Sequence, residues 1–89
     1  MSFFLLVHLL GRLVDSKFAE VVNLLTSSIG ELNEFKIQEI SFIYDEHNPD
    51  LVIEATKEML RTEKIRQPIR YIEGILNRWS SEGITNLST

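Results

Sequence analysis

The sequence has no cysteine among its 89 residues, and its two histidines lie in unrelated segments. Without cysteine the chain forms no disulfide framework and no thiolate metal site, a composition that suits a reducing cytoplasm. His8 and His47 have no ligand spacing with another histidine, so we expect no metal centre. The chain also lacks a nucleophile with a base at useful spacing, a glycine-rich phosphate loop and paired metal carboxylates. We therefore expect neither catalysis nor a cofactor.

No apolar run is long enough to cross a bilayer, which needs about 20 residues. The most hydrophobic segment, residues 3–14, is interrupted by His8, Gly11 and Arg12. It lacks the positively charged start and small-residue cleavage site of a secretion signal. It also lacks the polar face of a helix that lies on a membrane. We predict a helix covered by the domain's own core or by a second copy, in preference to a membrane anchor. We therefore expect no membrane contact and a cytoplasmic location.

Negative and positive charges are separated along the chain. The formal net charge of −4 argues against a protein that grips duplex DNA over its whole surface. Residues 1–60 carry 4 basic and 10 acidic side chains, whereas residues 61–78 carry 5 basic and 2 acidic ones. The basic residues of this second segment are Arg61, Lys64, Arg66, Arg70 and Arg78. They indicate either a solvated turn or a small phosphate-contacting patch.

Four segments have apolar residues at helical spacing, and each follows a residue that favours the start of a helix. The first two begin after capping side chains, and the last two begin after a cap followed by proline. The expected caps are Asp15 or Ser16, Asn33, Asn48 and Gln67. The helices should begin near Ser16, Asn33, Pro49 and Pro68.

These helices predict a compact all-α bundle over residues 16–86, with four main helices and a single core. Because the connections are short, consecutive helices should pack against each other. Residues 1–15 form an apolar amino-terminal segment that can add a further helix. The second helix carries the apolar residues Phe35, Ile37, Ile40, Ile43 and Tyr44. The predicted core includes Phe18, Leu25, Ile40, Ile53, Met59, Ile72 and Leu76.

The last predicted helix has a stripe of Tyr71, Ile75 and Trp79 at i, i+4 and i+8. Ile75 is central in the apolar arc and is interpreted as core. Trp79 is either a core anchor or a platform that stacks on an unpaired base. Tyr71, at the edge of the arc, is either a half-buried packing residue or a nucleic-acid contact. Gly74 costs about 1 kcal/mol relative to alanine within a helix, which suggests that another backbone approaches it closely.

The same helix carries a longer motif, in which the Tyr-x-x-x-Ile-x-x-x-Trp pattern is followed by Gly83-Ile84-Thr85. With this motif the chain resembles the DnaD-like domain, a helical module of bacterial and phage replication-initiation proteins. The upstream segments Phe18-Ala19-Glu20, Leu32-Asn33-Glu34 and 50–55 also resemble the family in order and spacing. The resemblance covers residues 18–86, nearly the whole chain.

The resemblance implies a non-catalytic replication module that binds single-stranded DNA weakly and helps primosome assembly and helicase loading. The implied partners are single-stranded DNA and other replication-initiation proteins, such as a helicase loader or the helicase, and a homo-oligomer remains open. A pure protein-interaction module without DNA binding is the alternative, docking through the apolar arc or the amino-terminal segment. The candidate DNA-binding residues are Tyr71, Ile75, Trp79, Lys64, Arg66, Arg70 and Arg78.

Overall fold

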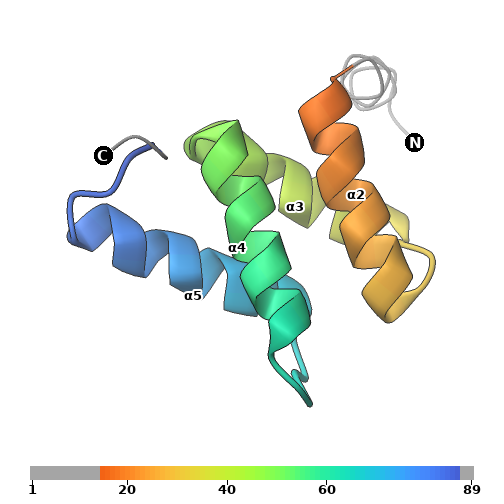
Figure 1. Cartoon of the computed structure of the whole chain (residues 1–89). Coiled ribbons are helices and arrows are strands. Elements are labelled where there is room, and N and C mark those ends of the chain that lie inside the picture. The colour runs from red at the N-terminus through yellow and green to blue at the C-terminus, as the bar shows by residue number, and fades with distance from the viewer. Residues whose placement is uncertain (1–14, 87–89) are drawn as a thin grey trace.

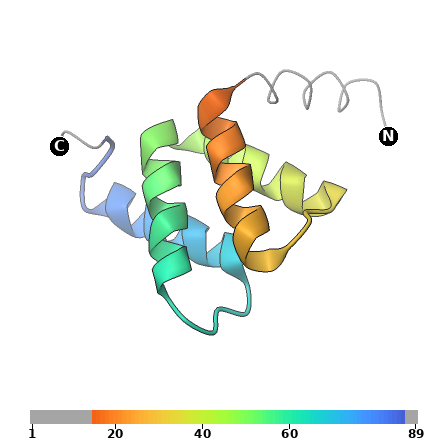
Figure 2. The same cartoon turned by 45° about the vertical axis from the view of Figure 1, so that its right-hand side comes forward.

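The computed structural model describes residues 15–86, and this part of the chain consists of four α-helices without a strand. The helices are α2 (Ser16–Ile29), α3 (Glu34–Glu46), α4 (Pro49–Arg61) and α5 (Pro68–Ser81). Helices α2 and α4 lie side by side and run in the same direction, while α3 and α5 cross behind them (Figures 1 and 2). The all-α prediction is confirmed. The predicted burial of residues 3–14 lies outside the described residues.

All four helices begin after the predicted cap residues, and in three of them the cap side chain accepts a hydrogen bond. Asp15 accepts hydrogen bonds from the backbone N–H groups of Lys17 and Phe18 at 3.0 and 3.2 Å. Asn33 and Asn48 likewise accept from backbone N–H groups, each at 2.9 Å. These bonds satisfy donors that have no partner within the helix. Helix α5 begins at Pro68 as predicted, with Gln67 at the N-cap position, but the Gln67 side chain makes no cap hydrogen bond. There the following proline alone favours the helix start.

Helix α4 lies at the centre of the domain. It buries Leu51, Val52, Ile53, Ala55, Thr56 and Met59, and it packs extensively against both α2 and α5. The polar Thr56 is accommodated because its hydroxyl donates to the carbonyl oxygen of Val52 at 2.8 Å. All seven predicted core residues are buried, which confirms the core derived from helical spacing.

Consecutive helices contact each other as expected, but α3 contacts α2 and α4 much less extensively than α4 contacts α5. Helix α3 buries residues only from Ile40 to Tyr44, in its second half. Phe35 is 80% exposed because, at 100° per residue, it lies about 140° from Ile40 and 180° from Tyr44, on the opposite face of α3. The second half is fixed to α2 by Tyr44. Its ring packs edge-on against Phe18 at 5.2 Å between centroids, and its hydroxyl donates to both carboxylate oxygens of Asp15 at 2.9 Å.

No close backbone approach accounts for Gly74, so that expectation was wrong. Gly74 is exposed within α5, and a Cβ added to it would meet no atom within 4 Å. We therefore expect Gly74→Ala to raise the free energy of unfolding by about 0.5–1 kcal/mol, measured by urea denaturation.

Gly83→Ala provides the matched control for this prediction. Gly83 has a φ of 82°, a left-handed conformation that strains residues with a side chain. This substitution should lower the free energy of unfolding although it adds the same methyl group. If Gly74→Ala also destabilises the protein, the position is not open space in solution.

Candidate nucleic-acid interface

The connection between α4 and α5 surrounds an open hollow of about 530 Å³. Its walls come from the residue that directly follows α4, from the rest of the connection and from the first turn of α5. The lining residues are Thr62, Glu63, Lys64, Ile65, Arg66, Gln67, Arg70 and Tyr71. We refer to this site as the Tyr71 hollow. It contains four of the seven predicted DNA-binding residues.

The aromatic group of the hollow is Tyr71, whose side chain is 38% exposed. Its hydroxyl lies 3.3 Å from the hydroxyl oxygen of Thr62, within hydrogen-bonding distance. Thr62 in turn donates to the carbonyl oxygen of Glu58 at 3.2 Å. These contacts hold the Tyr71 hydroxyl against the end of α4, while part of the ring faces solvent. The ring can therefore receive a planar group without first losing much rotamer freedom.

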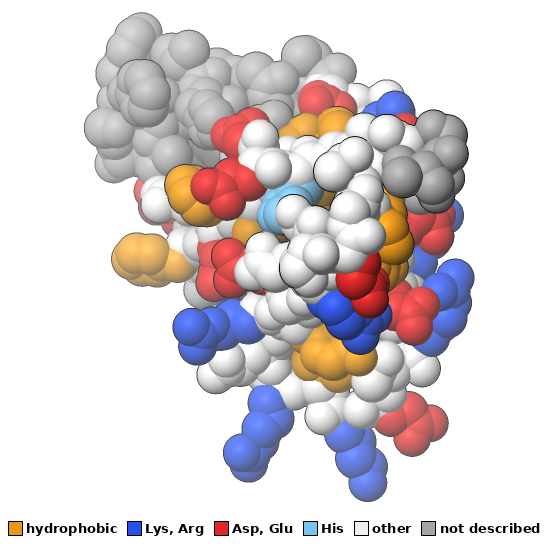
Figure 3. All heavy atoms as spheres, turned by 90° about the vertical axis from the view of Figure 1, so that its left-hand side faces the viewer, with side chains coloured by type: hydrophobic (Ala, Val, Ile, Leu, Met, Phe, Trp, Pro, Cys, Tyr) orange, Lys and Arg blue, Asp and Glu red, His pale blue; other side chains and the backbone are white. Residues whose placement is uncertain are grey.

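The cations of the hollow are Lys64, Arg66 and Arg70, and all three are exposed. Within residues 15–86, none of them makes an ion pair with a carboxylate. Arg61, by contrast, is held by Glu58 at 2.7 Å. Viewed from the side, Lys and Arg side chains project from the lower half of the molecule, towards the end where the α4–α5 connection lies (Figures 1 and 3). The three cations are thus available to an anionic ligand.

The backbone at Lys64 has a φ of 60°, the left-handed conformation that favours glycine. Such a conformation costs roughly 1–2 kcal/mol for a residue with a side chain. Lys64 lies in the bent connection between α4 and α5 and lines the Tyr71 hollow. Strained residues of this kind cluster at binding sites, where the surrounding structure holds them in place.

Ile75, Trp79 and Arg78 do not line the Tyr71 hollow. Ile75 is 5% exposed, which confirms its interpretation as a core residue. Trp79 is half-buried and packs against the same core. Arg78 is exposed but lies two helical turns, about 10 Å, beyond Tyr71 along α5. The structure therefore brings together the residues near the start of α5 and separates them from those near its end.

The carboxyl-terminal half of the sequence motif forms a helix stop. The N–H group of Ile84 donates to the carbonyl oxygen of Trp79 at 2.8 Å, and that of Gly83 donates to Ser80 at 3.1 Å. With the positive φ of Gly83, this is the hydrogen-bond pattern of a Schellman motif. Ile84 and Trp79 both pack against the core. The spacing from Trp79 to Gly83-Ile84 thus has a structural explanation of its own.

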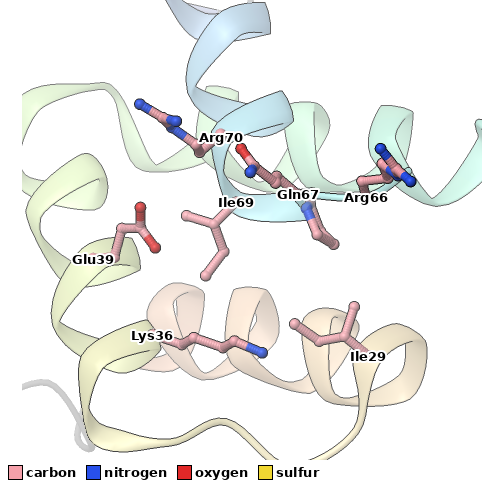
Figure 4. A pocket seen from close by; sticks show the side chains of 8 residues that line it. Ile29, Lys36, Glu39, Arg66, Gln67, Ile69 and Arg70 are labelled. Carbon is pink, nitrogen blue, oxygen red and sulfur yellow. The ribbon is translucent and has the colours of Figure 1, made fainter.

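A second hollow, of about 230 Å³, lies on the other side of Arg66, Gln67 and Arg70. Figure 4 shows Ile69 of α5 pointing towards the opposite wall, which is formed by Lys36 of α3 and Ile29 of α2. Glu39 of α3 also lines this space, so its charge is mixed. The two arginines line both hollows, and each hollow has three basic side chains and one acidic one, which is Glu63 in the Tyr71 hollow.

The sequence analysis did not identify Thr62 and Ile65 as parts of the site. Ile65 is half-buried and packs against the core, so it supplies an apolar wall below the cations. In the sequence, the only indication for Thr62 and Ile65 was that both lie in the few residues before Pro68.

Among residues 15–86 there is no group of three or more His, Cys, Asp or Glu side chains that could hold a metal ion. In the same part of the chain, no helix has the length and apolar character needed to cross a membrane.

The fold is that of a small helical module, with an exposed hollow lined by basic and aromatic side chains at the α4–α5 connection. A family model described as replication initiation and membrane attachment matches residues 22–89. The chain belongs to this family, the DnaD-like domain family, and the resemblance seen in the motif is confirmed. The description includes membrane attachment, whereas the sequence analysis expected no membrane contact. A search of curated proteins finds no match, and neither does a search of solved structures.

Proposed function

We propose that this replication-initiation module is non-catalytic and binds single-stranded DNA weakly through the Tyr71 hollow. The observation that carries the proposal is the exposed Tyr71 ring beside three cations without ion-pair partners in the described structure. An aromatic face can stack on an unpaired base of any sequence, a contact worth about 1–3 kcal/mol per base. Lysine and arginine side chains at its edge can neutralise the flanking phosphates.

The size and charge of the site favour weak binding to a short stretch of single strand. One ring and three cations can engage only a few nucleotides, and the rest of the chain is acidic. Base pairs in a duplex are already stacked, so the ring gains little from duplex DNA. We propose that the module works in the cytoplasm beside a helicase loader or the helicase, where single strands are exposed during initiation.

A salt-series titration tests the proposal directly. The full chain is added to a fluorescein-labelled single-stranded oligonucleotide, and fluorescence anisotropy is followed at salt concentrations from about 25 to 200 mM. Three phosphate contacts predict that log K falls with log salt with a slope of about −2, because each contact contributes roughly 0.7. A duplex of the same sequence should bind more weakly. Affinity that is independent of salt, or absence of binding at low salt, would contradict the proposal.

The alternative is a module that acts through protein contacts alone. The apolar arc of α5 is an unsuitable docking surface, because Ile72, Ile75 and Leu76 are buried in the domain's own core. One specific observation nevertheless favours protein contacts: Phe35 and Phe42 of α3 are 80% and 62% exposed.

A further inference from the structure

The outer face of α3 carries two large aromatic side chains that the domain does not use. Phe35 and Phe42 are seven residues apart, so they lie on one stripe of the helix about 10 Å from each other. Their exposed fractions are 80% and 62%. Together they present a paired apolar surface, whereas single exposed apolar residues are common. Such pairs on one helix face serve as anchors when a helix docks into a groove.

The charge of this face restricts what can cover it. At 100° per residue, Glu39 and Glu46 lie within about 40° of the aromatic stripe. Both acids are exposed. Phosphate groups are therefore repelled, and a complementary surface must combine an apolar or aromatic floor with basic edges.

The described part of this chain contains a surface of that kind. The Tyr71 hollow is lined by Ile65 and the Tyr71 ring and by three cations, Lys64, Arg66 and Arg70, which outnumber its one acid, Glu63. A phenyl ring that enters it would meet an aromatic and an aliphatic wall. The three cations could then contact the ring face, and they could pair with Glu39 and Glu46. Phe35 and Phe42 line neither hollow of their own chain.

We infer that the Phe35–Phe42 face of α3 docks into the Tyr71 hollow of a second copy of the chain. Two different surfaces meet in this contact, so each copy offers one aromatic face and one hollow. The buried area is small, since each aromatic side chain contributes at most about 250 Å². The contact is accordingly weak and forms at high micromolar concentrations. It does not depend on the DNA proposal, because it is measured without nucleic acid.

Two full-length variants test the contact by complementation. Phe35→Ser with Phe42→Ser removes the aromatic face and leaves the hollow intact. Lys64→Glu with Arg70→Glu disrupts the hollow and leaves the aromatic face intact. All four residues are exposed, so both variants should fold, which circular dichroism checks. Residues 1–14 are the same in both, and any association through them appears as a common background.

Sedimentation velocity at several hundred micromolar should show self-association of the unmodified chain. The association constant of each variant alone should be at least tenfold lower. An equimolar mixture should regain association, because the aromatic face of one variant fits the hollow of the other. The inference is overturned if the unmodified chain associates no more than the variants, or if the mixture associates no more than its components. Association of the Lys64/Arg70 variant at the unmodified level would instead indicate an α3–α3 contact and also overturn it.

Discussion

We expect Leu25→Ala to lower the free energy of unfolding by about 3–5 kcal/mol. Leu25 is 0% exposed and lies in α2, which packs along the central helix α4. The substitution removes buried apolar contacts and leaves a cavity that the surrounding helices can only partly fill. Native domains are stable by only about 0.05–0.15 kcal/mol per residue, so this loss removes a large part of the stability. The midpoint of unfolding should therefore fall to a much lower urea concentration, measured by far-ultraviolet circular dichroism and urea denaturation.

Phe35→Ala is the control for this prediction. It removes a larger apolar side chain, but one that is 80% exposed. The free energy of unfolding should change by less than about 0.5 kcal/mol. Comparable destabilisation by both substitutions would mean that Phe35 is buried in solution, either in the domain or against a second copy. A minor effect of Leu25→Ala would contradict the central packing of α2 on α4.

The sequence was sufficient to predict where the helices begin and which residues form the core, because both depend on local patterns. A capping side chain acts on backbone N–H groups two or three residues away, as Asp15 and Asn33 do. Helical spacing places Phe18 and Leu25 on one face whatever the rest of the chain does. Gln67 shows the limit of this reasoning, since its sequence position suits a cap but its side chain makes no such bond.

Properties that depend on the arrangement of the helices could not be predicted in the same way. Helix α3 buries residues only from Ile40 to Tyr44, and how much of it is covered depends on where the other helices lie. The space around Gly74 depends on what lies opposite α5, and nothing in the periodicity of α5 describes that. The central position of α4 also follows from the tertiary fold, because short connections suggested equal packing between neighbours in sequence.

The candidate site divides in the same manner. Lys64, Arg66, Arg70 and Tyr71 were predicted together and lie together, because they are close in sequence across one tight connection. Trp79 belongs to the same sequence motif, but the helix carries it about 12 Å further along its axis. Trp79 lies near the end of α5 at Gly83 and packs on the core, which gives it a structural role. The motif alone did not distinguish this role from contact with DNA.

We expect the triple replacement of Lys64, Arg66 and Arg70 by glutamine to weaken binding to single-stranded DNA strongly. If each residue contacts one phosphate, the salt slope of log K should shrink by about 0.7 per lost contact, or roughly 2 in all. At about 0.1 M salt the same relation gives a loss of affinity of roughly a hundredfold. The fold should remain intact, because exposed cations contribute little to stability. Fluorescence anisotropy across a salt series measures the slope, and a urea denaturation curve checks the fold.

The matched control is the replacement of Lys17, Lys57 and Arg61 by glutamine. It removes the same number of positive charges, but from side chains that already pair with Asp50, Glu54 and Glu58. If the general charge of the protein governs binding, both triple variants should lose affinity equally. If the Tyr71 hollow is the site, the control should keep most of its affinity and its salt slope. An unchanged slope in the Lys64/Arg66/Arg70 variant would identify the α4–α5 connection as an ordinary solvated turn. The module would then act through protein contacts instead of DNA.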